Sequence, residues 1–585
     1  MTRENRWNVA QIEDVNLIEK LSKEINIPLT IAKILVNRNI DTYDKAKQYF
    51  RPNVSHFHDP FLMDGMEKAV DRTLRAIKNK EKIMIYGDYD VDGTCGVAML
   101  YLFFTRYNPN VKYHIPDRVK EGYGVSNYGI DLAKEFGATL MITIDCGITA
   151  NEQVDYANSL GIDFIIADHH EPTSDIPKAY AVLDPLMHFC SYPFKYLSGC
   201  GVGFKYIQAI ARKLGEEEFV YSFLDFVTLA TTADIVPLVG ENRTLVKLGL
   251  KQINEIPRPG IKALIETAGL KIESLNSSQI VFMLAPRINA VGRLGNAERA
   301  VSLLISNNYQ EAMTHAQILE EENRNRRKID EEIYNHAQEL VENYLDFEND
   351  ASIILHQDDW HPGVIGIVAS RLVEKYYLPT IMMTTIDGVA KGSARSIAGF
   401  DIYQALKKVE DKLLQFGGHK YAAGLSVELE RLDEFKLAFN HAVKELMSEE
   451  LLKPEIKIDS EIDLTDITPR FQRILREFAP FGPQNSRPVF LAQKVQIAAP
   501  PKIVGKNHLR LKVRQNSPSR QGGTDIVDAI GFNLGHLRDK ATQSSNGMDV
   551  VFSLNESDWQ SNAPNGETFP QLKIKDLRPS IRTDS

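Results

Sequence analysis

Three aspartates alternate with other residues in the segment IMIYGDYDVDGTCG, which spans 83–96. Asp88, Asp90 and Asp92 follow an apolar run typical of a buried strand, and a helix-forming run comes after them. Three carboxylates at one strand end repel one another unless a cation lies among them. The pattern also resembles the start of a calcium-binding loop, but such a loop needs glutamate at its twelfth position, where this chain has Met99. A solvated acidic turn is the remaining alternative.

Further polar residues end later apolar runs in the same part of the chain. Asp145 ends TLMITID, Asp168, His169 and His170 end DFIIADHH, and Asp234 lies in FVTLATTADIVPL. Apolar strands separated by helical stretches predict a parallel sheet that is covered on both faces. Ligands of such sheets gather at the carboxyl ends of the strands. We therefore expect these side chains to lie together.

The residue types in this set indicate which cations to expect. Carboxylates with one or two imidazoles and no thiolate suit Mn²⁺ or Mg²⁺ better than structural zinc. The carboxylates are too many for one ion, whereas two ions bridged by a carboxylate would use them all, and such a pair activates water at a phosphoryl centre. Each residue also has a plainer interpretation: Asp145 as a helix cap, or His169 and His170 as a loop pair. Asp168 is better suited to orienting a neighbouring histidine than to binding metal.

Length and composition place limits on the class of protein. With 585 residues the chain predicts roughly three or four domains. The four cysteines show no CxxC spacing, which predicts reduced thiols rather than a zinc site or a disulfide framework. No apolar run is long enough to span a membrane, and the N-terminal residues do not resemble a signal peptide, so we expect a cytoplasmic protein. The net charge of −10 argues mildly against general nucleic-acid affinity, but local basic stripes can override it.

The pattern along the chain predicts an α/β protein followed by an all-β region. The predicted segments are a helical lead-in at 1–70, a catalytic α/β domain at 71–308, a connector helix at 309–346, a smaller α/β domain at 347–450 and a barrel at 454–585. The middle of the connector, EEENRNRRKIDEE, has almost no apolar face, which is typical of a helix that bridges two domains through solvent. The alternative is a strand-contacting helix with the bases Arg324, Arg326, Arg327 and Lys328.

Several blocks, in this order and spacing, resemble the RecJ family of single-strand-specific DNA exonucleases, within the DHH phosphoesterase superfamily. GDYDVDG, IDCG, ADHHEP and TTADIVPL are similar to the four superfamily motifs. IPDRVKEGYG, PRINAVGRLG, WHPGVIGIVASRL, KGSARS and GGHKYAAG are specific to the RecJ branch, and the resemblance covers roughly residues 20–580. It implies a DHH domain joined by the long helix to a DHHA1 domain, followed by an OB-fold domain.

The resemblance implies a site for two ions, Mn²⁺ or Mg²⁺. The implied metal ligands are Asp88, Asp90, Asp92, Asp145, His169 and Asp234, with Asp145 bridging and Asp88 an additional or outer ligand. Asp145, His169 and His170 form the implied catalytic set, in which His170 contacts the scissile phosphate. Pyrophosphatase relatives have a histidine four residues before Asp90, where this chain has Tyr86, so one metal is expected to be held more loosely.

The resemblance also implies a substrate-binding set. Ser393 and Arg395, two apart on an extended segment, offer a hydroxyl and a guanidinium fork to a terminal phosphate. We expect SARS and GGH to lie in loops, and for Arg287 and Arg293 a plain surface-loop position is the alternative. The implied residues are Arg118, Arg287, Ser393 and Arg395 in a pocket for the 5′-phosphate, Tyr123 as a stacking platform, and Asn289, Arg293 and His419 as further contacts.

The last region fits the same resemblance. HLRLKVRQ (508–515) alternates strictly, with Arg510, Lys512 and Arg514 on one side of the expected strand. A barrel with a basic stripe suits an OB-fold that binds single strands, although a plain solvated strand face is the alternative.

The implied activity is 5′-to-3′ hydrolysis of single-stranded DNA to 5′-mononucleotides, in recombination and repair. The implied partners are a helicase and a single-strand-binding protein. The alternatives are a DHH phosphoesterase acting on short oligonucleotides or nucleotides, and a non-catalytic DNA-binding replication scaffold.

Overall fold

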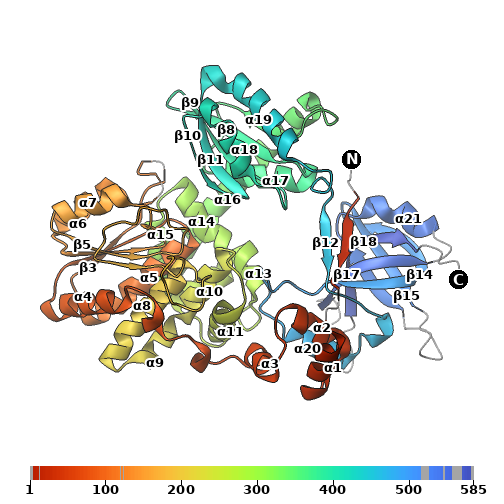
Figure 1. Cartoon of the computed structure of the whole chain (residues 1–585), viewed down its shortest axis with the longest axis horizontal. Coiled ribbons are helices and arrows are strands. Elements are labelled where there is room, and N and C mark those ends of the chain that lie inside the picture. The colour runs from red at the N-terminus through yellow and green to blue at the C-terminus, as the bar shows by residue number, and fades with distance from the viewer. Residues whose placement is uncertain are drawn as a thin grey trace. The chain divides into compact units, whose positions relative to one another are not determined.

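The computed structural model of the chain describes residues 4–11, 14–118, 120–122, 124–515, 526–543, 547–556 and 570–580 (Figure 1). The chain forms two compact units. The first contains the described residues of Met1–Glu4, His58–Val236 and Gly249–Pro454, and the second those of Asn5–Phe57, Pro237–Leu248 and Glu455–Ser585.

A five-stranded parallel sheet forms the centre of the first unit. Its strands are β3 (Val111–His114), β2 (Ile83–Gly87), β4 (Leu140–Ile144), β5 (Asp163–Ala167) and β6 (Ala181–Leu183), in that spatial order. Every residue of β2 and β4 is buried, which explains their continuous apolar sequences. The strand order reverses at β2, so the carboxyl ends of β2 and β4 flank the position where such sheets bind ligands.

Helices cover both faces of this sheet, as the sequence predicted (Figure 1). The helices α6 (Asn127–Phe136) and α7 (Asn151–Ser159) pack on one face, and α5 (Val91–Tyr107) and α8 (Gly199–Leu214) on the other. The edge strand β3 was not predicted, because it is short and only one of its four residues is fully buried.

Between Met66 and Tyr344 the chain forms further helices. They are α4 (Met66–Asn79), α9 (Glu217–Val220), α10 (Leu224–Ala233), α11 (Gly240–Glu255), α12 (Pro259–Thr267), α13 (Ser277–Gln279), α14 (Ala285–Leu294), α15 (Glu298–Ile305) and α16 (Tyr309–Tyr344). None of the helices in the described part of the chain is both long enough and apolar enough to cross a bilayer.

The middle of α16 differs from the prediction that it passes through solvent. Asn323, Arg326 and Asp330 are buried on one face of this helix, which packs against α14 and α17. Arg326 donates to Oδ1 of Asn323 at 3.2 Å, and Arg371 donates to Oδ1 of Asp330 at 3.1 Å. The prediction was wrong for this face, because composition does not reveal that charged side chains pair with one another inside the fold.

A second, mixed sheet lies in the same unit. Its spatial order is β10 (Gln415–His419), β11 (Ala422–Glu428), β9 (Val389–Arg395), β8 (Thr380–Ile386) and β7 (Ile353–His356), with helices α17 (Ile365–Tyr376), α18 (Ile402–Lys407) and α19 (Leu432–Leu446). SARS and GGH were predicted in loops, but SAR ends β9 and GGH ends β10. Their small and polar residues resemble a loop sequence, whereas pairing of both strands with β11 makes them strands.

The second unit contains a closed β-barrel. Its strands are β14 (Phe490–Val504), β15 (His508–Arg514), β16 (Val527–Gly531), β18 (Pro570–Pro579) and β17 (Met548–Glu556), and pairing of β14 with β17 closes the barrel. The short strand β13 (Ser460–Glu461) extends it, and α20 (Pro469–Arg476) and α21 (Arg538–Gln543) accompany it. The alternation predicted along β15 is confirmed: Leu509, Leu511 and Val513 are buried, whereas Arg510, Lys512 and Arg514 are exposed.

The N-terminal helices belong to this same unit. They are α1 (Val15–Glu24), α2 (Leu29–Asn37) and α3 (Tyr43–Phe50). Ile31, Ile34 and Leu35 of α2 share one core with Phe471 and other barrel-side residues. In addition, β1 (Arg6–Val9) pairs in parallel with β12 (Glu455–Ile458). The helices α1, α2 and α3 therefore contribute side chains to the core around the barrel.

Candidate active site

Three neighbouring strands of the parallel sheet end in register. Gly87 of β2 pairs with Ile144 of β4, and Ile144 pairs with Ala167 of β5. The first residues beyond these ends are Asp88, Asp145 and Asp168. The fold therefore brings carboxylates that are up to 80 residues apart in the sequence together at the carboxyl ends of these strands.

The first aspartate motif forms the turn from β2 into α5. Oδ1 of Asp90 accepts hydrogen bonds from the backbone N–H groups of Asp92 (2.8 Å) and Gly93 (3.1 Å), so Asp90 caps the helix. Asp88 is buried, and its Oδ1 has no hydrogen-bond partner among the described residues. One oxygen of Asp90 is thus used for the cap, whereas Asp88 keeps an oxygen for another ligand.

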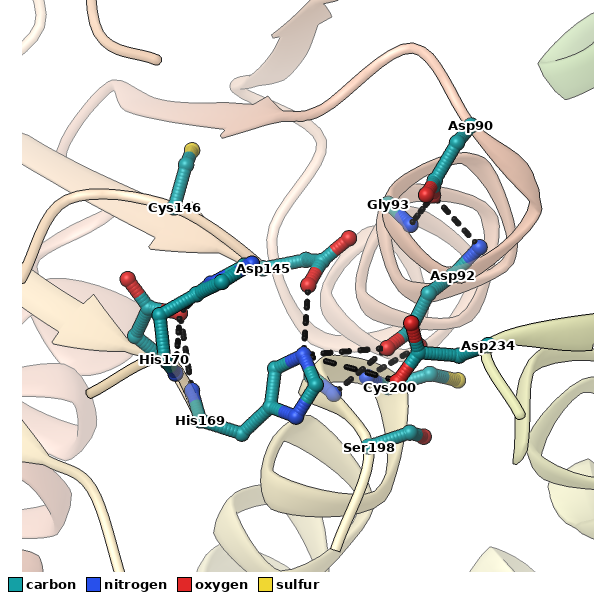
Figure 2. Close-up of polar contacts among 12 residues, drawn as sticks. Asp90, Asp92, Gly93, Asp145, Cys146, His169, His170, Ser198, Cys200 and Asp234 are labelled. Carbon is teal, nitrogen blue, oxygen red and sulfur yellow. Dashed lines mark hydrogen bonds and ion pairs between the residues drawn. The ribbon is translucent and has the colours of Figure 1, made fainter. Parts of the chain in front are cut away.

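Asp92 is held by the N-terminus of α8 (Figure 2). Its two carboxylate oxygens accept from the backbone N–H groups of Gly199 (2.6 Å) and Cys200 (2.7 Å). A Cβ atom on Gly199 would lie 2.6 Å from Cβ of Asp145, so only glycine allows α8 to approach this closely. The N-terminal turn of α8 is rich in glycine, with Gly199, Gly201 and Gly203. In the structure it packs closely and binds a carboxylate.

His169 lies at the centre of the acidic residues (Figure 2). Its Nε2 is 3.1 Å from Oδ1 of Asp145, 3.6 Å from Oδ2 of Asp234 and 3.7 Å from Oδ2 of Asp92. Asp145 has φ of 62°, a left-handed conformation that aspartate tolerates better than most residues. The carboxylate of Asp145 thus lies between His169 and the first aspartate motif.

Among the described residues, the potential ligand atoms fall into three groups, and within each group they lie within 4.8 Å of one another. The groups are Asp88, Asp90 and Asp145; Asp92, His169 and Asp234; and Asp145, His169 and His170. The third group shares Asp145 with the first and His169 with the second, so the contact of Asp145 with His169 links the first two. In the part of the chain that is described, Oδ1 of Asp88, Nε2 of His169 and Oδ2 of Asp234 are buried without a hydrogen-bond partner. Buried carboxylate oxygens and an imidazole nitrogen that lack hydrogen-bond partners are suitable ligands for two divalent cations.

The pKa values of these aspartates and of His169 also indicate that cations bind among them. Burial and the charge of Asp90 raise the pKa of Asp88 to about 8 and that of Asp92 to about 7. Burial and neighbouring aspartates raise the pKa of Asp145 and Asp234 well above the ordinary value. Burial is the largest cause of these shifts and the neighbouring carboxylates add to it, whereas bound cations would oppose both effects. Burial and the charge of His170 lower the pKa of His169 to about 4, so this imidazole is neutral and its lone pair can bind metal.

The pKa of His170 is raised, whereas that of His169 is lowered. Its Nδ1 donates to Oδ1 of Asp168 at 2.7 Å, and Asp168 also accepts from the backbone N–H groups of His169 and Ile148. Despite burial, the hydrogen bond and charge of Asp168 raise the pKa of His170 to about 9, and His170 in turn lowers that of Asp168 to about 2. Asp168 therefore orients a cationic His170, as was expected of this aspartate.

A group of arginines lies next to the aspartates Asp88, Asp90, Asp92, Asp145, Asp168 and Asp234, which we call the acidic cluster. Burial and the charges of Arg118, Arg326 and Arg395 lower the pKa of Arg293 to about 10. The guanidinium of Arg118 lies 5.3 Å from the ring centre of Tyr89, the residue between Asp88 and Asp90. We call Arg118, Arg293, Arg326 and Arg395 the arginine cluster.

Ser393 accompanies the arginine cluster. Its Oγ accepts from Nη1 of Arg395 at 2.9 Å, so these two side chains share one face of β9, as their spacing predicts. Arg326 was named only as one of four bases in the alternative of a strand-contacting helix, and its signal in the sequence is weak. Polar residues at Asn323, Arg326 and Asp330 follow helical spacing, but they stand within a run that is charged on all sides.

The other predicted substrate residues lie in different surroundings. Arg287 is ion-paired through Nε with Glu320 of α16 at 2.6 Å, and it donates to the carbonyl of Met283. Oδ1 of Asn289 accepts from the backbone N–H of Val91 at 3.1 Å. Tyr123 lies outside the described residues.

His419 lines the same hollow as the two motif histidines. This hollow has a volume of about 530 Å³ and is lined by His169, His170, Glu171, Asp401, Tyr403, Gly418, His419 and Lys420. The mixed sheet therefore supplies one wall of a cavity beside the acidic cluster.

Known protein families match three parts of this chain. Residues 82–231 match the "DHH family, N-terminal domain", residues 349–445 the "DHHA1 domain" and residues 458–576 the "RecJ OB domain". The parallel sheet, its acidic strand ends and the accompanying mixed sheet define a DHH-type protein. Relatives that match nearly the whole chain show which family within this class it belongs to.

The single-stranded-DNA-specific exonuclease RecJ of Bacillus subtilis is 36% identical over 579 residues, which cover 98% of this chain and 71% of the relative. The protein of the same description from Escherichia coli is 33% identical, over 86% of this chain and 89% of the relative. The crystal structure of Thermus thermophilus RecJ in complex with Mn²⁺ superposes with a TM-score of 0.82 at 26% identity, over 99% of this chain and 80% of that chain. The chain belongs to the RecJ family.

Proposed function

We propose that this chain is a metal-dependent exonuclease that hydrolyses single-stranded DNA from the 5′ end and releases 5′-mononucleotides. The observation that carries this proposal is the acidic cluster, with Asp145 shared between two potential ligand sets, in a chain 36% identical to a single-stranded-DNA-specific exonuclease. A catalytically silent scaffold would not need so many buried carboxylates, because each one destabilises the folded chain when no cation is bound.

The cofactor of this activity is a pair of Mn²⁺ or Mg²⁺ ions. Thermus thermophilus RecJ has been solved with each of these metals. Asp88, Asp90 and Asp145 would hold one ion, and Asp92, His169 and Asp234, with Asp145 shared, would hold the other. When bound, such a pair activates water and neutralises charge on the phosphoryl oxygens.

The chain's own residues position the substrate. His170, cationic and fixed by Asp168, donates a hydrogen bond to a non-bridging oxygen of the scissile phosphate. Arg118, Arg293, Arg395 and Ser393 bind the terminal 5′-phosphate. A strand anchored in this way presents its next linkage to the acidic cluster, which gives the 5′-to-3′ polarity.

Arg287 is a weaker candidate for the phosphate pocket, because Glu320 already neutralises it. His419 contacts the nucleotide from the hollow that it shares with His170. Tyr123 remains a proposed stacking residue. The exposed bases of β15 bind the backbone of longer strands.

The same proposal includes the cellular setting. Single-stranded DNA ends arise in recombination and repair, so we propose that the enzyme acts there in the cytoplasm. A helicase would supply the single strand, and a single-strand-binding protein would coat it.

Digestion of strands labelled separately at each end tests this function. With Mn²⁺, a 5′ label should appear in mononucleotides at once, a 3′ label should appear there only at the end, and blunt duplex should resist digestion. EDTA should stop the reaction. Earlier release of the 3′ label, or equal digestion of duplex, would contradict the proposal. Faster hydrolysis of dinucleotides than of long strands would favour a phosphoesterase of short oligonucleotides.

A further inference from the structure

The loop that carries the first aspartate motif packs against helix α14. Tyr89, which stands between Asp88 and Asp90, places its carbonyl oxygen where α14 has Gly292. A Cβ atom on Gly292 would lie 2.5 Å from that oxygen and 3.3 Å from Cβ of Tyr89. Since the nearest atom belongs to the backbone, no side-chain rotation could relieve this contact. The metal-ligand loop and the helix are therefore in direct backbone contact.

A second contact lies one helical turn earlier on α14. Oδ1 of Asn289 accepts a hydrogen bond from the backbone N–H of Val91 at 3.1 Å. Asn289 and Gly292 are three residues apart, so they lie on the same face of the helix. One face of α14 thus contacts the metal-ligand loop at two points, on both sides of Asp90.

The C-terminal end of α14 contacts the turn before α17. Nη1 of Arg293 donates to the carbonyl oxygen of Gly363 at 2.9 Å, and a Cβ atom on Gly363 would lie 2.7 Å from the carbonyl oxygen of Arg293. A few residues on, a Cβ atom on Gly366 would lie 2.8 Å from Nη2 of Arg395 and 2.8 Å from Oγ of Ser393. Close contacts therefore connect α14 with the side chains proposed to bind the 5′-phosphate.

The arginine cluster also reaches back to the metal-ligand loop. Arg118 lies over the ring of Tyr89, with its Cζ 5.3 Å from the ring centre. The residue that touches Gly292 through its backbone is thus the one that touches Arg118 through its side chain. Tyr89 is therefore in contact both with α14 and with the arginine cluster.

We propose that the segment Asn289–Arg293 of α14 is a spacer that fixes the distance between the acidic cluster and the arginine cluster. Because a packed helix is stiff, this distance determines which phosphodiester, counted from the terminal phosphate, meets the metal ligands. Gly292 is a positioning residue, and the property it controls is the length of the released product. The inference rests on the proposed function and adds a specificity determinant to it.

The variant Gly292→Ala tests the spacer, with Gly295→Ala as its matched control. Gly295 lies three residues further along the chain, is exposed and has φ of −153°, and the nearest atom to a Cβ there would be 3.7 Å away. Strands with a 5′-phosphate or a 5′-hydroxyl are digested with Mn²⁺, and the products are separated by length. For Gly292→Ala we expect cleavage at the first linkage to fall about 100-fold. We also expect longer products to appear and the preference for the 5′-phosphate to fall, whereas Gly295→Ala should behave like the parent enzyme.

Two further measurements separate positioning from folding. The thermal midpoint and the number of bound Mn²⁺ ions should stay close to the parent values in Gly292→Ala. If this variant does not fold, Asn289→Ala, which adds no bulk, should show the same changes to a smaller degree. A folded Gly292→Ala or Asn289→Ala with unchanged product length and unchanged 5′-phosphate preference would overturn the spacer. A parent enzyme that cleaves no single strands would instead overturn the proposed function, and the spacer with it.

Discussion

Two clusters of like charge lie side by side in the first unit, and they are built in different ways. The acidic cluster comes mainly from the ends of adjacent strands in one sheet, where the register alone places Asp88, Asp145 and Asp168 at one edge. The arginine cluster is gathered from a loop, two helices and a strand of another sheet. The first needs only correct pairing of the parallel strands, whereas the second needs α14, α16 and β9 to pack correctly on one another.

Each cluster buries groups of like charge close together, carboxylates in the acidic cluster and guanidinium groups in the arginine cluster. Burial and neighbouring aspartates raise the pKa of Asp145 well above its ordinary value, whereas burial and neighbouring arginines lower the pKa of Arg293 to about 10. In Asp145 and in Arg293 the ionised form is therefore disfavoured until a ligand of opposite charge binds. Cations fill that role for the carboxylates, and a phosphate fills it for the guanidinium groups.

Removing the shared carboxylate should have the largest effect. We expect Asp145→Asn to lower Mn²⁺-dependent cleavage by roughly 1000-fold, a loss typical of a central electrostatic group. In EDTA at neutral pH the same change should raise the thermal midpoint. The folded-state pKa of Asp145 is raised, so its ionised form opposes folding, and asparagine removes that charge while tolerating φ of 62°.

The control for this variant is Asp155→Asn, on the exposed side of α7. It should change neither cleavage nor the thermal midpoint measurably. Retained cleavage in Asp145→Asn would show that Asp145 does not bridge, and a lower midpoint in EDTA would show that its charge is compensated within the chain.

A smaller effect should follow from a change in the arginine cluster. Arg395→Ala should reduce the ratio of kcat/KM for 5′-phosphorylated over 5′-hydroxyl strands by roughly 10- to 100-fold, the range of charge-assisted hydrogen bonds. Lys391→Ala, an exposed change on the same strand, should leave the ratio unchanged. An unaltered ratio in Arg395→Ala would remove this residue from the phosphate pocket.

The smallest effect should come from the barrel. Replacing Arg510, Lys512 and Arg514 by alanine should weaken binding to long single strands and reduce the salt slope by about 0.7 for each phosphate that the stripe neutralises. Hydrolysis of very short strands should not change. Lys20→Ala with Lys23→Ala, exposed on α1 in the same unit, serves as control. An equal loss on short strands would contradict a separate binding role for the stripe.

The strands and their acidic ends could be predicted from the sequence because both signals are local. A buried strand such as β2 or β4 reads as a continuous apolar run, and a polar residue directly after it must lie at the edge of the sheet. The alternation along β15 is equally local, because side chains on a strand point to opposite faces in turn.

The remaining features depend on contacts between distant segments. Nothing near Arg326 in the sequence indicates that its face of α16 is buried against α14 and α17. The apolar face of α2 predicts a helix but not that its partners are Phe471 and the barrel-side core more than 400 residues later. Gly292 gives no local signal in the sequence, because what requires glycine there is the backbone of Tyr89, about 200 residues earlier in the chain.

Titration with Mn²⁺, followed by electron paramagnetic resonance, tests the shared-ligand metal site most directly. The two ligand sets that Asp145 links predict two bound ions per chain and a spectrum broadened by coupling between neighbouring Mn²⁺ centres. In Asp145→Asn the coupled signal should disappear. A single uncoupled ion in the parent enzyme, or an unchanged coupled signal in Asp145→Asn, would contradict a two-metal site bridged by Asp145.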